Sequence, residues 1–382
     1  MKKLILALAI STTLSAQPAL AADHDVGPVL RHYAGLVYAN YVDAVSGARG
    51  LQRAIDAFLA HPSAETQEAA RKAWRVAREF YGQTEAFRFY GGPIDGEQGP
   101  EPRINAWPMD ESYVDGVQGR PEAGLINDPR FVINRDNVIA QNERGGEENI
   151  ASGWHAIEFL LWGQDLNADG AGARPYTDFT TAPHADRRRQ YLKVITDLLV
   201  DDLTQVAKEW KPGRPFNYRA RFEKGGLESL RQVFVGLGSL SRGELAGERM
   251  EVALASQDQE DEHSCFSDNT HRDVVNNALG IENVWLGRYR RADGSLLQGP
   301  SLKDLVATRD AALADQTSRR IAQSVANAHA IQAPFDREVV GGKDAPGRGR
   351  VQATIDSLVL QSKDLVAAAN AVGVSKLTLV QP

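Results

Sequence analysis

The sequence has 382 residues, a formal net charge of −7 at pH 7 and a single cysteine, Cys265. No stretch of it is dense in Lys or Arg, so we expect no nucleic-acid partner, and one cysteine excludes an internal disulfide framework. A chain of this length usually divides into two domains.

The first residues carry the pattern of a secretory signal peptide. Lys2 and Lys3 precede an apolar run, LILALAI, and the small-residue site ALA follows at residues 19–21. The run is too short to cross a bilayer, and no later segment reaches the apolar length of a membrane helix. We therefore predict that residues 1–21 are removed. The mature chain would be exported to a bacterial periplasm, or to the surface of the outer membrane, without being an integral membrane protein.

Helical periodicity follows directly after this segment. Between residues 29 and 59, apolar side chains recur at steps of three and four, which is typical of an amphipathic helix. Gly47 and Gly50 predict a bend or a division of this helix. Ser63 is the predicted N-cap of a second helix, which ends at the Gly-Gly-Pro of residues 91–93.

The next stretch, residues 91–146, has no sustained period and is rich in Gly, Pro, Asn and Asp. So long an irregular connection is unusual unless it has a function. Helical periodicity then returns, and no persuasive alternating strand does. The further helices that we predict cover residues 147–162, 185–210, 227–255, 271–279, 302–330 and 351–369.

This series of helices predicts an all-α protein built from two similar four-helix bundles with long irregular loops. The N-terminal bundle would cover residues 22–210 and carry the segment GWHAIE. The C-terminal bundle would cover residues 211–382 and carry the segment CFSDNTHRD. An acid-rich segment after a long helix in each half is weak support for a duplication.

The helix predicted to end at residue 162 carries an imidazole and a carboxylate among apolar side chains. His155 and Glu158 are three residues apart and therefore share one helix face. A buried charge without a partner is costly, so the pair must be hydrogen-bonded, bound to a metal or shifted in pKa. A purely structural His–Glu hydrogen bond is one interpretation and a metal site is the other. Gly153 would let another backbone approach this helix closely.

Further ligands for a metal would have to come from other segments, because His-Glu-x-x-His, the zinc-peptidase pattern, is absent. Carboxylates combined with imidazoles suit iron, manganese or zinc. The candidates are Glu85 on the preceding helix, Asp110 and Glu111 beside Trp107 in the long loop, and the cluster of Glu260, Glu262, His263, Asp268 and His271.

Several separated motifs resemble one known family. The run GWHAIE, residues 153–158, resembles the Gly-x-His-x-x-Glu signature of imelysin-like proteins, and FLLWGQD resembles its usual continuation. The segments RINAWPMDESYVDG, CFSDNTHRD and NVWLGRYRRADG are similar to the iron-regulated protein A branch of that family. The resemblance implies an exported fold of two helical bundles, with the functional site between them. It places His155 and Glu158 at the signature positions, and it matches Glu85 to an acid on the preceding helix.

Three functions follow as hypotheses. The first is a metal-binding protein for bacterial iron uptake or homeostasis, with a divalent or ferric ion near His155, Glu158 and Glu85 at the domain interface. Iron is the expected ion and zinc the alternative, and iron-transport components are the expected partners. The second is a zinc metallopeptidase that uses the same pair, although no residue is marked out as its general base. The third is a non-catalytic helical interaction protein whose His–Glu pair is structural.

Overall fold

The computed structural model describes residues 25–167 and 170–380, so the predicted signal peptide lies outside the described residues. The prediction of an all-α protein is confirmed. Within the described part, strands form only one small antiparallel hairpin, β1 (Arg288–Arg290) and β2 (Leu296–Gln298). No described helix combines the length and the apolar character that a membrane crossing requires.

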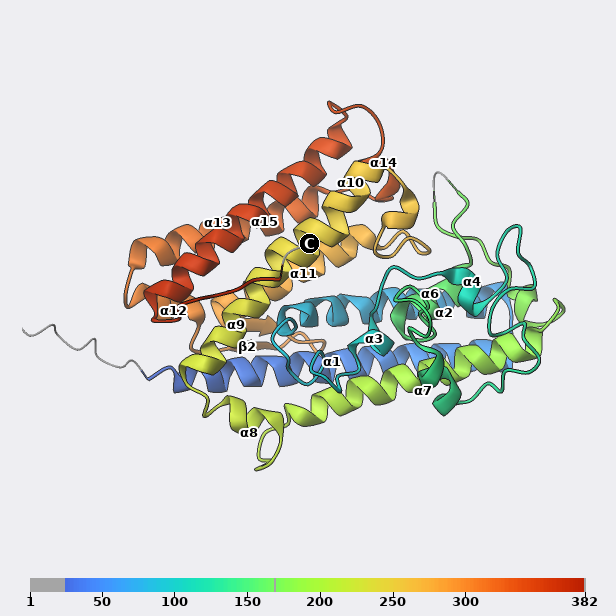
Figure 1. Ribbon diagram of the computed structural model, residues 1–382, viewed down its shortest axis with the longest axis horizontal. Helices are drawn as coiled ribbons and strands as arrows, with labels where there is room; N and C mark the ends of the chain where they lie inside the picture. Colours follow the sequence, from blue (N-terminus) through green and yellow to red (C-terminus); the bar gives the residue numbers. More distant parts are fainter. Residues whose placement is uncertain (1–24, 168–169, 381–382) are drawn as a thin grey trace, which may run out of the picture.

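The long helices of the N-terminal half lie together in one layer. They are α1 (Gly27–Ala60), α2 (Ala64–Tyr81), α6 (Gly153–Trp162) and α7 (Ala185–Glu209). Helix α1 packs against α2 and α7, and α6 packs against α7 and α2 (Figure 1). The predicted N-cap of α2 is confirmed, because the hydroxyl of Ser63 accepts a hydrogen bond from the backbone N–H of Thr66 at 3.2 Å.

The structure corrects two local predictions in this half. Helix α1 is not divided at Gly47 or Gly50, and a bend at these glycines stays a prediction. A Cβ on Gly47 would lie 3.0 Å from the Cα of Ala77, so this glycine allows α1 and α2 to approach each other. The helix predicted over residues 147–162 begins only at Gly153. The residues before Gly153 lie outside the helix, because the side-chain oxygen of Asn142 accepts a hydrogen bond from the backbone N–H of Ala151 at 2.9 Å.

The irregular connection before α6 holds several short elements. They are η1 (Gly82–Phe87), which continues directly from α2, and then α3 (Glu101–Ile104), α4 (Glu111–Val114) and α5 (Arg135–Gln141). Short elements also occur between the other long helices. They are η2 (Tyr176–Phe179), α8 (Tyr218–Phe222), η4 (Gln259–Asp261), α12 (Leu302–Ala307) and α14 (Asp336–Val339).

The C-terminal half forms the second layer, coloured yellow to red in Figure 1. Its long helices are α9 (Leu227–Ser239), η3 (Leu240–Glu251), α10 (Val252–Ser256), α11 (Thr270–Leu286), α13 (Ala311–Ala330) and α15 (Pro346–Ala371). Helix α15 packs against α13, η3 and α9. Helix α11 packs against α13 on one side and against η1 and α2 of the N-terminal half on the other. Helix α11 is therefore the main link between the two layers.

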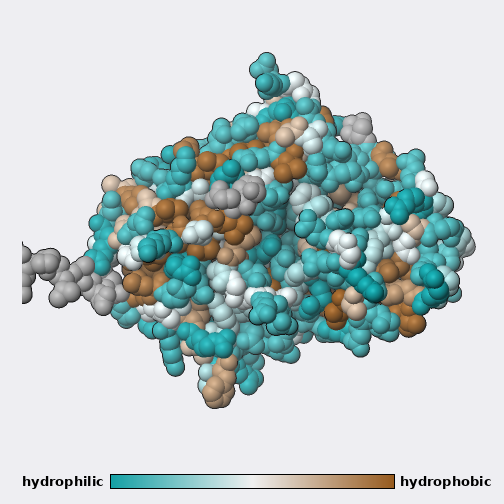
Figure 2. Space-filling model, viewed as in Figure 1, coloured by the Kyte–Doolittle hydropathy of each residue, from teal (hydrophilic) through white to brown (hydrophobic). Residues whose placement is uncertain are grey.

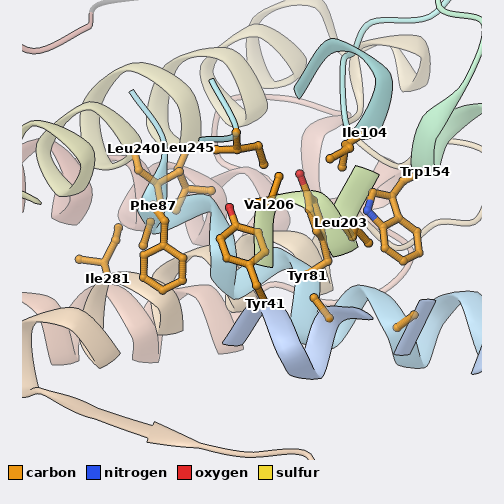
Figure 3. Packing of buried hydrophobic residues seen from close by; sticks show 14 of the residues in the cluster. Tyr41, Tyr81, Phe87, Ile104, Trp154, Leu203, Val206, Leu240, Leu245 and Ile281 are labelled. Carbon is orange, nitrogen blue, oxygen red and sulfur yellow. The ribbon is translucent and has the colours of Figure 1, made fainter. Parts of the chain in front are cut away.

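Buried apolar side chains from both halves form one connected cluster. Figure 3 shows Tyr41 and Phe87 of the N-terminal half in the same region as Leu240, Leu245 and Ile281 of the C-terminal half. The division into two bundles at residues 210 and 211 stays a prediction. Figure 2 shows a mainly hydrophilic outer face, with hydrophobic residues gathered towards the end where α9 and α12 lie.

Candidate functional site

Helix α6 places His155 and Glu158 together in the interior. All ten residues of α6 are buried. Nδ1 of His155 lies 3.0 Å from Oε2 of Glu158. The other carboxylate oxygen of Glu158, Oε1, accepts hydrogen bonds from the backbone N–H of Ser267 at 2.9 Å and from its hydroxyl at 2.6 Å. The pair is thus hydrogen-bonded internally and is joined to the C-terminal half of the chain.

Gly153 determines where α6 can begin. Its φ is +94°, a left-handed conformation that favours glycine. A Cβ at this position would lie 2.6 Å from the carbonyl oxygen of Ile104 and 2.8 Å from that of Arg103. The first turn of α6 therefore lies against the backbone of α3, and Gly153 acts in packing rather than as a ligand.

A second buried imidazole faces His155 from the C-terminal half. The ring centroids of His155 and His263 are 4.7 Å apart, with an interplanar angle of 73°. Nδ1 of His263 lies 2.8 Å from Oδ2 of Asp273, to which the hydroxyl of Ser264 also donates, at 2.5 Å. Oδ1 of Asp273 pairs with the guanidinium of Arg78 at 2.9 Å. We call His155, Glu158, His263 and Asp273 the histidine centre.

Both imidazoles of the histidine centre keep a free nitrogen. The Nε2 atoms of His155 and His263 are buried and have no hydrogen-bond partner, whereas each Nδ1 is held by a carboxylate. Metal-ligating histidines are oriented in this way, because the carboxylate fixes the tautomer and leaves the other nitrogen for the ion. Oε1 of Glu85 is a further buried oxygen without a partner.

Glu85, which lies in η1, is held by two arginines. Its Oε2 accepts hydrogen bonds from Arg88 at 2.6 Å and from Arg249 at 2.7 Å. Arg249 donates as well to Glu244 at 2.7 Å and to Asn277 at 2.6 Å. Burial opposes the ionisation of Glu85, but the two arginines lower its pKa to about 2. Glu85 is therefore a fixed negative charge.

The helical geometry of η3 makes part of this network. It is a π-helix, whose i→i+5 hydrogen bonds bring residues five apart towards one face. Glu244 and Arg249 are five apart, and Nε of Arg249 lies 3.1 Å from Oε1 of Glu244. On an α-helix the same two positions would point about 140° apart. Such helical segments occur frequently at functional sites.

Burial controls the protonation of the histidine centre. It lowers the pKa of His155 well below its ordinary value, and it lowers the pKa of His263 to about 4 with help from the charge of Arg249. Burial also raises the pKa of Glu158 to about 8. Both imidazoles are therefore neutral at pH 7, which is the form that binds a metal ion, whereas Glu158 holds a proton at that pH and must lose it to accept the Nδ1–H of His155 as a carboxylate.

An acidic cleft of about 420 Å³ reaches His263. Trp107 lines this cleft, and its ring centroid lies 5.8 Å from that of His263. Arg88 lines it too, but carboxylates dominate: Glu101, Glu143, Glu147, Glu244 and Glu248. A concave surface with this excess of negative charge attracts cations.

Other residues singled out from the sequence lie elsewhere. Asp110 caps α4 by accepting the backbone N–H of Ser112 at 2.9 Å. Nδ1 of His271 lies 3.1 Å from the carbonyl oxygen of Asp268. The acids at residues 111, 260, 262 and 268 form a separate acidic region, in which Glu111 contacts Glu260 and Glu262 is repelled by Asp268.

The structure also contains a compact carboxylate group. One oxygen each of Asp165, Asp268 and Asp336 lies within 4.8 Å of the other two. Within residues 25–167 and 170–380, no other set of three or more His, Cys, Asp or Glu side chains comes that close. The predicted ligand set of His155, Glu158 and Glu85 stays a prediction, and the structure pairs His155 with His263 rather than with Glu85.

Several residues around the histidine centre were not singled out from the sequence as ligands or supports. They are Arg78, Arg249, Ser267 and Asp273, and His263 was noted only as a member of its cluster. One signal was available, because Arg78 follows Trp74 and precedes Tyr81 at helical spacing, on the apolar stripe of α2. A buried arginine needs a buried acid as its partner. The identity of that acid depends on tertiary packing.

Comparisons with known proteins place the chain among relatives. Residues 37–365 match the model of the imelysin family, which also bears the name peptidase M75. Iron-regulated protein A of Synechococcus elongatus is 26% identical over 325 residues, which cover 83% of this chain and 77% of that protein.

Two solved structures share the fold. An iron-regulated protein A precursor from Parabacteroides distasonis has a TM-score of 0.72 and 19% identity, covering 92% of this chain and 96% of that chain. An imelysin-like protein from Psychrobacter arcticum has a TM-score of 0.64 and 15% identity, covering 88% of this chain and 92% of that chain.

Proposed function

This chain belongs to the imelysin family, and from that premise we propose that it binds one iron ion at the histidine centre and serves iron uptake or homeostasis. The observation that carries the proposal is the pair of Nε2 atoms of His155 and His263. Both are buried and unpartnered, and the two halves of the chain each supply one. The relation to a protein named iron-regulated protein A supports iron as the ion.

The donor set fits such an ion. Two imidazole nitrogens and a carboxylate oxygen suit iron, with zinc as the alternative. His155 and His263 would supply the nitrogens. Oε1 of Glu85 is also unpartnered, but the three atoms do not all lie within 4.8 Å of one another, so Glu85 would have to move to complete the set. Both oxygens of Glu158 are already engaged, so Glu158 would orient His155 rather than bind the ion. Asp273 would orient His263 in the same way.

The surroundings favour capture of a cation as cargo. The acidic cleft beside His263 would concentrate cations at the site. Arg78, Arg88 and Arg249 hold the carboxylates of Asp273 and Glu85 in fixed positions. Fixed supporting groups reduce the ordering that accompanies binding.

A zinc metallopeptidase is the second candidate, favoured by the two imidazoles and by the peptidase name of the family. Hydrolysis also requires a general base beside the metal-bound water. Burial would raise the pKa of Glu85, but its two arginines lower it to about 2. Glu85 is therefore a poor base. Metal binding without catalysis is therefore the better supported function. Hydrolysis of an unfolded protein by the zinc-loaded chain, lost in His263→Ala, would reverse this ranking.

We also propose export to the periplasm through residues 1–21, with transfer of the ion to iron-transport components. The solved relative from Parabacteroides distasonis is described as a precursor, which supports a processed N-terminus. N-terminal sequencing of the protein from cell fractions tests this. A periplasmic chain that begins near residue 22 is expected, and an unprocessed chain in the cytoplasm would contradict export.

Metal titration tests the histidine centre directly. The full chain is freed of metal with a chelator and titrated with Fe²⁺ under anaerobic conditions, and then with Zn²⁺. We expect one ion per chain, and affinity at least about tenfold weaker in His155→Ala and His263→Ala. The matched control is His329→Ala, because His329 is exposed at the end of α13. Variants that melt earlier but bind iron as the unmodified chain does would show that the pair is structural only.

A further inference from the structure

We propose a second metal site, separate from the histidine centre, for a hard divalent cation, with calcium as its occupant. Its ligands are Asp165, Asp268 and Asp336, and Glu262 lies beside them with its carboxyl against that of Asp336; we call the four residues the aspartate cluster. Asp165 lies just after α6, Glu262 just after η4, Asp268 just before α11, and Asp336 opens α14. Figure 1 shows α6 and α14 at the same end of the molecule. Three segments from both halves of the chain thus converge on one point, and the segment of Glu262 lies beside it.

Proximity of carboxylates is common without an ion, so the decisive observation is the burial of unpartnered oxygens here. Glu262 is 0% exposed, and neither of its oxygens has a hydrogen bond of normal geometry, although the hydroxyl of Thr270 lies nearby. Its carboxyl lies against that of Asp336. Asp165 and Asp336 are only 2% and 7% exposed, and each keeps one oxygen without a partner. Buried carboxylate oxygens without donors are rare in folded proteins, because each costs free energy.

Little positive charge offsets these carboxylates. Apart from Arg309 and Arg337, no Arg, Lys or His among residues 25–167 and 170–380 forms an ion pair with any of the four. The charge of Arg75 reaches Asp268, but Arg75 lies over the ring of Trp162 at 5.0 Å and pairs with Glu68 at 3.4 Å. Oδ1 of Asp165 accepts the backbone N–H of Asn167 at 2.9 Å, which satisfies that oxygen only.

The cluster as it stands therefore favours protons or a cation. Burial, followed by the charge of Asp336, raises the pKa of Asp268 to about 7 and that of Glu262 well above its ordinary value. Two carboxylate oxygens cannot approach closely unless a proton or a metal ion lies between them.

The donors decide which cation fits. All of them are carboxylate oxygens, which suit calcium, magnesium and manganese rather than softer metals. Magnesium keeps several waters and takes one or two carboxylates, whereas calcium accepts many oxygen ligands in flexible geometry. Three aspartates and a glutamate in a largely buried position therefore favour calcium. The ion would tie the segment after α6 to the segment of Ser267, which supports Glu158.

Calcium titration of the metal-free full chain tests the assignment. We expect one calcium ion per chain and a higher melting temperature in its presence. Asp165→Asn and Asp336→Asn should each weaken calcium binding at least about tenfold, since each removes one charged ligand. Glu262→Gln is the third variant. The matched control is Asp315→Asn on the exposed face of α13, which should bind calcium as the unmodified chain does.

The outcomes separate this site from the histidine centre. His155→Ala and His263→Ala should leave calcium affinity unchanged, so either site can fail while the other stands. Circular dichroism checks that each asparagine variant is folded, which we expect because the variants remove uncompensated charge. The proposal is overturned if the unmodified chain binds no calcium, or if both asparagine variants bind it equally well. Tighter binding of magnesium than of calcium would overturn the choice of ion.

Discussion

The histidine centre and the aspartate cluster both bury carboxylates between the two halves of the chain, but they neutralise them differently. Near the histidine centre, Asp273 pairs with Arg78, and Glu85 pairs with Arg88 and Arg249. In the aspartate cluster, Arg309 and Arg337 apart, the described residues form no such ion pair. Despite comparable burial, the pKa of Glu85 is lowered to about 2, whereas that of Glu262 is raised well above its ordinary value.

This difference shows that burial alone does not set the charge of a group. Desolvation penalises the charged form in both regions, and the arginines decide the sign of the net shift. At Glu85 and Asp273 the arginines therefore offset the charge without an ion, whereas the pKa of Glu158, which pairs with no arginine, is raised to about 8 by burial. The aspartate cluster is left with oxygens that need a proton or a cation. Removing a charged side chain should therefore lower the free energy of unfolding near the histidine centre and raise it in the metal-free aspartate cluster.

The largest effect should come from removing an arginine near the histidine centre. Arg249→Met leaves Glu85, Glu244 and Asn277 without their shared donor in a buried position. We expect it to lower the free energy of unfolding by about 3–5 kcal/mol, the cost typical of breaking a buried ion pair. Urea unfolding measures this. Arg231→Met is the control, because Arg231 pairs with Glu228 at the surface, where such pairs contribute little. Equal losses of unfolding free energy in the two variants would show that the buried ion pairs of Arg249 contribute no more than a surface pair.

The next effect should come from the start of α6. Gly153→Ala places a Cβ against the carbonyl oxygen of Ile104 at a positive φ. We expect a loss of about 2–3 kcal/mol and weaker iron binding at the histidine centre, with calcium binding unchanged. Gly349→Ala is the control, because Gly349 lies on the exposed side of α15 with open space around it. That change should be neutral or slightly stabilising. A calcium affinity that falls together with the iron affinity would show that the two sites are not separate.

The smallest effect should appear in the pH dependence of the metal-free chain. Burial raises the pKa of Asp165 to about 6, so the folded chain holds this proton more tightly than the unfolded chain does. The resulting contribution to the free energy of unfolding is fully present below about pH 4 and is lost as the pH rises through 6. The pKa of His263, lowered to about 4 by burial, has the opposite consequence, because stability is lost as the pH falls from about 6.5 to 4.

Asp165→Asn should therefore unfold like the unmodified chain near pH 4.5 in the presence of a chelator. At pH 7.5 it should be more stable by about 1 kcal/mol, a figure discounted for solvent screening. Added calcium should reverse that order. A variant less stable than the unmodified chain at pH 7.5 without calcium would show that Asp165 is compensated after all.

The sequence was sufficient for features that depend on neighbours along the chain. Helical periodicity predicted the all-α fold, and Ser63 predicted the start of α2. The three-residue spacing of His155 and Glu158 predicted their contact within a buried helix. Each of these follows from the local geometry of a helix.

Features that depend on tertiary packing could not be predicted. Glu158 meets Ser267, and His155 meets His263, only because α11 packs against η1 and α2. The low helix propensity of Gly47 allowed a division of α1, but α1 is continuous there because α2 packs closely against it. The π-helical winding of η3 leaves no separate period in the sequence, although it brings Glu244 to Arg249.

Anomalous diffraction from crystals of the iron-loaded chain tests the central claim most directly. The account predicts a peak at the iron absorption edge within bonding distance of Nε2 of both His155 and His263, and none in crystals treated with a chelator. Iron bound at the aspartate cluster or at the surface alone, with both Nε2 atoms hydrogen-bonded to water, would contradict it.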